Sequence, residues 1–265
     1  MRRWFGKLFC LGVLTLALPV GAAEEDAAPA STGWFDTVKT DACAFPDRLL
    51  EDTRATFWNA PSLIALAGAG AASAVMHTTR ADDHVADYFA RHETFGRFTE
   101  ESLYVVGSPP FHFGATALWY VFEAKSGDAP GRQRAVTMLS ALTITGAVTG
   151  GLKLAVHNHQ PDGGLFSWPS GHTASSVAVA SVLHEFYGWK VGLPAYAGAG
   201  LVAWRMMDES DHWASDVVFG AVLGWVVGHT VAGRHGAVDL AGFELLPSYG
   251  NSQTPAAGLS LAKRF

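Results

Sequence analysis

The apolar residues of this chain gather in long Ala-, Leu- and Val-rich segments, which are interrupted by Gly, Pro and clusters of charged residues. Segments of this kind, without sustained alternation of polar and apolar positions, predict helices rather than strands. The sequence therefore predicts an all-α domain. We expect helices near residues 46–56, 61–77, 98–106, 111–123, 132–156, 171–187, 192–207 and 212–232.

The C-terminal segment 236–265 has a different pattern. Prolines and glycines between residues 247 and 255 predict a loop. The following GLSLAKRF alternates Leu259, Leu261 and Phe265 with polar positions, which is the pattern of a short strand. We expect a tail that packs on the helices or stays loose, with this strand as the alternative. We therefore end the helical domain at residue 235 and expect a short irregular or β-like tail.

Some of the apolar segments are long enough to cross a bilayer. The uncharged runs 55–79 and 103–122 contain 25 and 20 residues, and a spanning helix needs about 20. Glycine spacing of four residues lets helix backbones approach closely, as in many membrane bundles. We expect a membrane-embedded bundle, with a tightly packed soluble periplasmic bundle as the alternative. The glycines with this spacing are Gly220, Gly224 and Gly228, and Gly146 and Gly150.

The N-terminus has the three parts of a secretory signal. Residues 1–23 begin with MRRWFGK, continue with an apolar run from Leu8 to Pro19, and end in small residues. An uncleaved anchor helix is the alternative, but this run is shorter than the ~20 residues of a span. Residues 24–44 are rich in Ala, Ser, Thr and acidic residues, which predicts a flexible leader before a helical domain over 45–235.

Composition and charge exclude several classes of protein. With 49% hydrophobic and 16% charged residues, the chain is neither disordered nor fibrous. The formal net charge is −6, and loss of the first 23 residues leaves 15 basic and 24 acidic side chains. Nucleic-acid-binding proteins normally carry the opposite sign, so we expect no nucleic-acid partner. Nothing in the sequence implies a protein partner.

Polar residues interrupt the apolar chain at PSGHTASS. Ser170 is suited to cap a helix there, which leaves the first backbone N–H groups free. A helix N-terminus of this kind attracts a phosphate-like anion. His172 in the first turn would face the same anion and could protonate a leaving oxygen.

A second polar cluster, HWASD, places His212 and Asp216 four residues apart on one helix face. The carboxylate can accept from one imidazole nitrogen and leave the other free to attack. Lys153 ends a long apolar helix, where an isolated ammonium is costly unless it meets an anion or water. A phosphate bound opposite Lys153 would offset this cost.

These residues resemble the signature of the type 2 phosphatidic acid phosphatase (PAP2) superfamily. The family pattern has three parts, KxxxxxxRP, PSGH and SRxxxxxHxxxD. The corresponding segments are KLAVHNHQP from Lys153 to Pro161, PSGH from Pro169 to His172, and RMMDESDHWASD from Arg205 to Asp216. The resemblance is close over residues 135–232. It implies a PAP2-like helical bundle with about six core helices.

The resemblance also implies a mechanism without metal or cofactor. His212 would be the nucleophile that forms a phosphohistidine, Asp216 would orient it, and His172 would protonate the leaving group. Lys153, Ser170 and Gly171 would hold the phosphate oxygens. The implied activity is that of a phosphatase acting on a lipid phosphate, of the phosphatidic acid or isoprenyl diphosphate type, or on a small phosphate ester. The implied location is the bacterial cell envelope, with a periplasm-facing site.

Two further candidate phosphate ligands depart from the family pattern. Gln160 stands where the first motif has arginine, and an amide brings neither charge nor a bidentate fork. Arg205 precedes His212 by seven residues instead of six, and Met206 takes the matching position. Either one extra residue in the DESD turn restores Arg205 to the site, or Arg205 points elsewhere.

Three other hypotheses remain open. The departures at Gln160 and Arg205 are also expected of a catalytically degenerate member that binds phosphorylated lipid or is structural. A vanadate-dependent haloperoxidase would use the same site, but tight binding of vanadate needs more arginines than this sequence offers. A metal site at His157 and His159 lacks a clear third ligand. For His112 we expect a hydrogen-bonded structural role.

Overall fold

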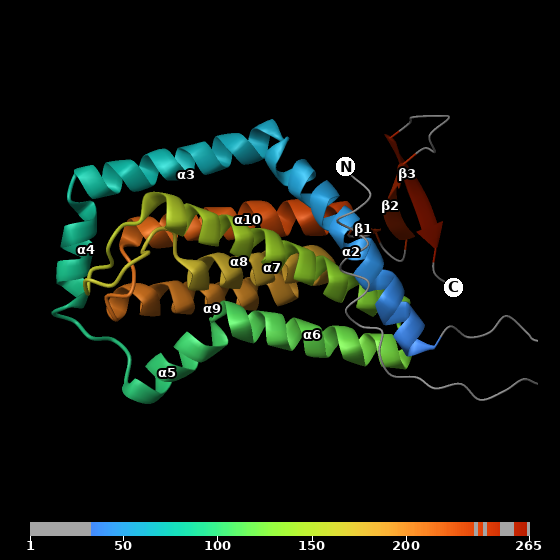
Figure 1. Cartoon of the computed structure of the whole chain (residues 1–265), viewed down its shortest axis with the longest axis horizontal. Helices are drawn as coiled ribbons and strands as arrows, with labels where there is room; N and C mark the ends of the chain where they lie inside the picture. The colour runs from blue at the N-terminus through green and yellow to red at the C-terminus, as the bar shows by residue number, and fades with distance from the viewer. Residues whose placement is uncertain (1–32, 236–237, 241–242, 250–256, 264–265) are drawn as a thin grey trace, which may run out of the picture.

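The computed structural model describes residues 33–235, 238–240, 243–249 and 257–263. The helical part of this range is a bundle, so the all-α prediction is confirmed (Figure 1). The helices are α2 (Trp34–Phe57), α3 (Ala60–Thr78), α4 (Ala81–Phe89), α5 (Arg97–Val106), α6 (Pro109–Ser126), α7 (Ala129–Val156), α8 (Gly171–Tyr187), α9 (Trp189–Asp208) and α10 (Ala214–His235).

Each predicted helix is present, with two differences at the N-terminal side. The short helix α4 was not predicted, because it has only nine residues and three of them are aspartates. Helix α2 begins at Trp34, so the predicted leader over 24–44 is wrong for residues 34–44. Contacts with α6 and α7 order this part, since Asp41 accepts from Tyr120 Oη at 2.8 Å and pairs with Arg132. The predicted signal 1–23 and residues 24–32 lie outside the described residues.

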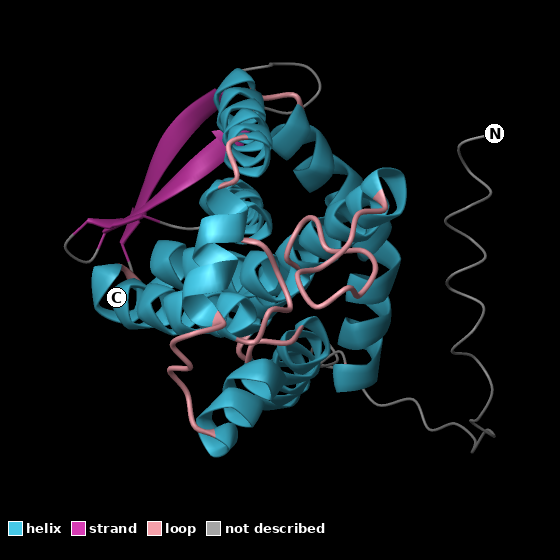
Figure 2. Cartoon of the chain, turned by 90° about the vertical axis from the view of Figure 1, so that its left-hand side faces the viewer, coloured by secondary structure: helices cyan, strands magenta, loops and turns pink. Residues whose placement is uncertain are grey.

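Helices α7, α8 and α10 form the centre of the bundle (Figures 1 and 2). Helix α8 packs against both α9 and α10, and α3 covers the outer side of α10. The fully buried side chains in this core include Leu142 of α7, Val182 of α8, and Leu223 and Val227 of α10. The site residues on α7, α8 and α10 are therefore carried by the most rigidly packed helices.

Three glycines of α10 let its backbone touch that of α8. A Cβ atom on Gly220, Gly224 or Gly228 would lie 2.7, 2.2 or 2.7 Å from a backbone carbonyl oxygen of α8. The close approach predicted for this glycine series is confirmed. The same prediction for Gly146 and Gly150 is wrong, because a Cβ at either position meets nothing within 4 Å.

We expect Gly224→Ala to lower the free energy of unfolding by about 1–3 kcal/mol, because the added methyl overlaps the Ala174 carbonyl. Gly146→Ala is the matched control, since it adds the same methyl to open space and should be neutral or slightly stabilising. Thermal unfolding of both purified variants measures the difference. Equal melting temperatures would contradict the contact.

The described part of the tail is a three-stranded antiparallel sheet. Strands β1 (Val238–Leu240), β2 (Phe243–Tyr249) and β3 (Ala257–Lys263) pair in sequence order, with Leu245 opposite Leu261. The β-like tail is confirmed. The described residues of the tail contain more than the one strand considered from the sequence. A strand needs partners for its backbone hydrogen bonds, and β2 provides them for β3.

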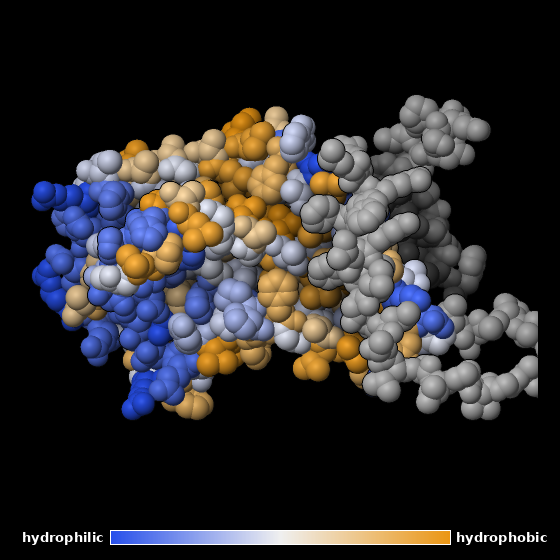
Figure 3. Space-filling view, viewed as in Figure 1, coloured by the Kyte–Doolittle hydropathy of each residue, from blue (hydrophilic) through white to orange (hydrophobic). Residues whose placement is uncertain are grey.

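Among the described residues, three helices are long and apolar enough to cross a membrane, namely α3, α7 and α10. The uncharged run 55–79 corresponds to α3, whereas 103–122 is divided between α5 and α6. Figure 3 shows hydrophilic residues at the end of the molecule where α4 and α5 lie, and apolar residues over the middle. Large exposed apolar side chains there include Ile64, Leu118 and Phe122. This surface supports a bundle surrounded by lipid.

Candidate active site

The N-terminus of α8 has the predicted cap. Ser170 Oγ accepts from the backbone N–H of Thr173 at 3.4 Å. The backbone N–H of Ser170 donates to the carbonyl of Asp216 at 3.1 Å, which ties the start of α8 to the start of α10. The first N–H groups of α8, at Gly171 and His172, have no carbonyl partner within the helix and can receive an anion.

His212 and Asp216 form the buried pair that the spacing predicted. Nδ1 of His212 lies 3.2 Å from Oδ2 of Asp216, and these residues are 6% and 1% exposed. The same carboxylate accepts from the Trp213 backbone N–H at 3.0 Å and from the Ser167 hydroxyl. The hydrogen bonds from Trp213 and Ser167 fix the position of this carboxylate, and the carboxylate in turn orients the ring of His212. Nε2 remains as the nitrogen available for attack.

Lys153 lies in the last turn of α7, and its ammonium reaches across to the loop before α8. Nζ donates to the carbonyl of Ser167 at 2.8 Å and also to the carbonyl of Phe166. Asp216 is within electrostatic range. The ammonium thus donates to neutral carbonyl oxygens at the edge of the site. A bound phosphate can take the place of these oxygens as the acceptor.

His172 lies where the three predicted motifs meet. Its ring lies on that of Tyr104 with 4.8 Å between centroids, and its Nε2 is buried without a partner in the described part of the chain. Burial, and to a smaller degree nearby positive charges, lower the pKa of His172 to about 4. Those charges come from side chains of α6, α7, α9 and the turn before α10: His212, Arg205, His112 and Lys153.

The lowered pKa of His172 predicts the pH dependence of turnover. Its acid form is the minority well above pH 4, so if His172 donates the proton, kcat/KM rises as pH falls from 7 towards 4. His172→Asn removes this titration but not that of the substrate. The measurement is the ratio of the two variants' kcat/KM values for p-nitrophenyl phosphate at each pH. A ratio that does not change with pH would contradict the acid role.

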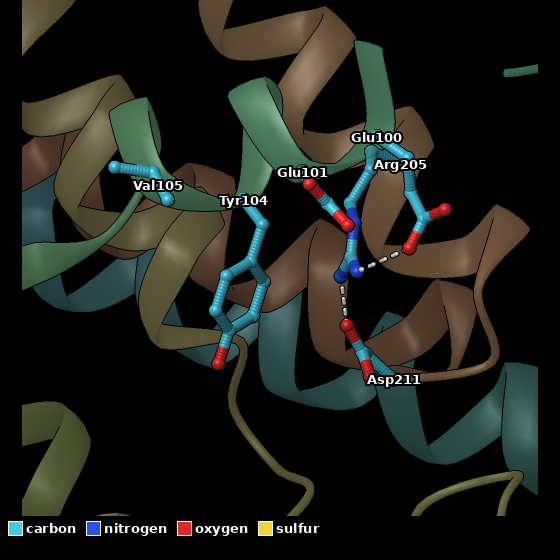
Figure 4. Close-up of a pocket in the computed structure, with 6 residues that line it drawn as sticks. All are labelled: Glu100, Glu101, Tyr104, Val105, Arg205 and Asp211. Atoms are coloured by element: carbon cyan, nitrogen blue, oxygen red, sulfur yellow. Dashed lines mark hydrogen bonds and ion pairs between the residues drawn. The ribbon is translucent and has the colours of Figure 1, made fainter. Parts of the chain in front are cut away.

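Arg205 lies over the ring of Tyr104, whose ring also contacts that of His172. Its guanidinium lines a cavity of about 450 Å³, whereas Met206 is fully buried in the core. One terminal nitrogen donates to the carboxylate of Asp211, and the other to Glu100 Oε1 at 3.3 Å (Figure 4). The turn takes up the extra residue with a left-handed backbone at Ser210, where φ is 60°. Because carboxylates engage both terminal nitrogens, the role of Arg205 as a phosphate ligand stays a prediction.

Gln160 lies in the tight turn 160–164. Its backbone N–H donates to the carbonyl of Gly164 at 2.8 Å. Its Oε1 occupies the space beside Gly164, 2.1 Å from where a Cβ would stand. No hydrogen bond in the described residues joins its amide to Lys153 or His212. The structure therefore does not bring Gln160 together with the other candidate ligands, and its role stays a prediction.

Several residues around the site were not predicted from sequence. Ser167 fixes Asp216, and only its closeness to PSGH hints at a role. Tyr104 and Glu100 come from α5, which carries no recognisable motif. His112, expected to be structural, is hydrogen-bonded to Ser175 at 3.0 Å, and its charge also reaches His172.

The metal hypothesis at His157 and His159 gains no support. The described residues contain no group of three or more His, Cys, Asp or Glu side chains that could hold a metal ion. His157 packs edge-on against Phe166, with ring centroids 4.6 Å apart. The carbonyl of His159 accepts from Trp213 Nε1 at 2.8 Å. Both residues thus shape the loop beside the site.

Comparison with known proteins finds similarity over the part of the chain that contains Lys153, His172, His212 and Asp216. Residues 134–237 match the family model described as the PAP2 superfamily. A lipid A 1-phosphatase from Porphyromonas gingivalis is 33% identical over 91 residues, which are 33% of this chain and 20% of that protein. The match thus spans about a fifth of the length of this curated relative.

A solved structure shares the fold. It is described as the crystal structure of the first transmembrane PAP2 type phosphatidylglycerolphosphate phosphatase from Bacillus subtilis. The TM-score is 0.53 at 19% sequence identity, and the match covers 64% of this chain and 94% of that chain. At this identity the likeness shows the fold, and the predicted PAP2-like helical bundle is confirmed.

Proposed function

We propose, from the premise that residues 134–237 form a PAP2 superfamily domain, that this protein is a metal-independent phosphatase acting through a phosphohistidine on His212. The observation that carries the proposal is the buried His212–Asp216 pair, in electrostatic range of His172 at the N-terminus of α8. A nucleophile, its orienting carboxylate and a proton donor then share one site. The substrate is a lipid phosphate or a small phosphate ester.

The mechanism has two steps. In the first, Nε2 of His212 attacks phosphorus, the bond from phosphorus to the ester oxygen breaks, and His172 gives its proton to that oxygen. In the second, neutral His172 takes a proton from water, the hydroxyl attacks phosphorus, and the P–N bond breaks to release phosphate. Lys153, the Ser170 hydroxyl and the backbone N–H of Gly171 stabilise the equatorial oxygens in both steps.

A membrane lipid phosphate is the substrate class that the surroundings favour. Helices α3, α7 and α10 can span a bilayer, and both relatives named above are phosphatases whose printed names specify a lipid or a phospholipid phosphate.

The test is phosphate release by the purified full chain in detergent with EDTA present. The substrates are phosphatidic acid, undecaprenyl diphosphate and p-nitrophenyl phosphate. We expect release without added metal, and an acid-labile phosphoryl group on the protein after rapid quenching. Preference for a panel member distinguishes lipid from soluble substrate. No release from any member, or release that needs added metal, would contradict the proposal.

A catalytically degenerate lipid-phosphate binder is the second candidate. Arg205 is engaged by two carboxylates, and Gln160 turns to Gly164. Of these two residues and Lys153, Lys153 is then the one whose positive charge no carboxylate of the described residues neutralises through a direct contact. This candidate predicts binding of phosphatidic acid vesicles that Lys153→Ala weakens, with no release of phosphate. Release by the wild type would exclude it.

A further inference from the structure

The cavity that Arg205 lines lies beside the proton donor of the proposed reaction. It is lined by α5, by Arg205 at the end of α9 and by Asp211 in the turn that follows (Figure 4). The ring of Tyr104, which also lines it, contacts the ring of His172. Its volume of about 450 Å³ is within the range of small-molecule sites, about 300–1,000 Å³. A proton donor faces the leaving oxygen, so the group attached to that oxygen must occupy space next to His172.

The cavity lining carries excess negative charge. The charged side chains that line it are those of Glu100, Glu101, Asp211 and Arg205. Glu101 pairs with Arg97 at 2.9 Å, which leaves Glu100 and Asp211 against the single guanidinium of Arg205. Asp211 and Glu100 both accept from this guanidinium, which neutralises it. Glu209 stands next to Glu100, and burial together with the charge of Glu100 raises the pKa of Glu209. A second anion brought into this cavity would meet like charge.

Arg205 supplies the second feature of a binding site. The residue is 7% exposed, and its Nε is buried without a hydrogen-bond partner in the described residues. Its guanidinium lies over the Tyr104 ring, 4.7 Å from the centroid, which fixes the plane of the fork. An unpartnered buried donor is costly, and a neutral oxygen of a ligand would satisfy it.

We propose that this cavity is the leaving-group subsite of the phosphatase, and that it selects phosphate esters whose alcohol carries an ammonium group. Glu100 and Asp211 attract the ammonium, and Arg205 donates to a neutral oxygen of the same alcohol. Esters that carry a second anionic group are rejected. The inference rests on the proposed function, because it takes His172 as the proton donor to the ester oxygen.

The test compares three probes of equal length: 3-aminopropylphosphonate, butylphosphonate and 3-carboxypropylphosphonate. Phosphonates are not hydrolysed, so calorimetry measures binding to the full chain in detergent whether or not the protein turns over. We expect the ammonium probe to bind roughly tenfold more tightly than the neutral one, and the carboxylate probe to bind more weakly still. The corresponding phosphate esters are then assayed for phosphate release.

Variants that remove one carboxylate charge test which residues favour the ammonium probe. Glu100→Gln and Asp211→Asn should each bring the Kd values of the three probes closer together. Asp83→Asn is the matched control, because it removes one exposed carboxylate from α4 at the same end of the bundle, outside the cavity lining. It should keep the order of the probes and their spacing.

The outcomes separate the inference from the proposed function. Equal Kd values for all probes, tighter binding of the carboxylate probe, or an equal effect of Asp83→Asn would overturn the inference. Selective binding without hydrolysis of any ester would overturn the proposed function and leave the charge selection of the cavity standing. Hydrolysis of all three esters at equal kcat/KM would overturn the selection alone.

Discussion

Replacing His212 by alanine is expected to reduce phosphate release by at least about a thousandfold. The imidazole is the group that bonds to phosphorus in the proposed reaction, and loss of a covalent nucleophile removes the pathway rather than weakening it. Binding should change little, because Lys153 and the N-terminus of α8 remain in place. The measurement is kcat/KM for phosphate release together with the Kd of butylphosphonate.

Two controls give this result its meaning. His92→Ala removes an exposed imidazole that stacks on Tyr88, with ring centroids 4.4 Å apart, and should leave the rate unchanged. Rapid quenching of His212→Ala should yield no acid-labile phosphoryl group. If this variant keeps more than about a tenth of wild-type kcat/KM while folding normally, another residue is the nucleophile.

Short-range spacing explains which parts of the site could be predicted from the sequence. Residues four apart meet on one helix face whatever the rest of the fold does, so His212 and Asp216 pair as predicted. The cap at Ser170 likewise depends on the three residues after it. The helices themselves follow from apolar segments too long for strands, and their ends agree within a few residues except in α2.

Contacts between distant segments explain what could not be predicted. Tyr104 reaches His172 because α5 packs against α9 and α6 across the site end. The partners of Arg205 are Glu100, which is 105 residues away, and Asp211 in the irregular turn. Gln160 turns away because the loop closes on Gly164. None of these pairings leaves a periodic signal in the sequence.

The second large effect is expected from Asp216→Asn. The asparagine fits the same space. Its carbonyl oxygen can take the place of Oδ2, which accepts from the Trp213 backbone N–H, from the Ser167 hydroxyl and from Nδ1 of His212. The oxygen is then neutral, and it no longer stabilises the positive charge that the ring of His212 gains when Nε2 bonds to phosphorus. We expect kcat to fall on the order of 10²–10³-fold with KM nearly unchanged.

A double-mutant cycle with His212 distinguishes this loss of charge from a general loss of structure. If Asp216 acts through His212, then Asp216→Asn added to His212→Ala lowers the residual rate no further. If the carboxylate mainly holds the loop through Ser167, the two substitutions multiply, and Ser167→Ala alone reproduces the loss. Three results together require that Asp216 acts through His212. Asp216→Asn unfolds at a near-wild-type temperature, its kcat falls while its KM does not change, and it has no effect on the rate when added to His212→Ala. A collapsed loop would also impair binding of butylphosphonate.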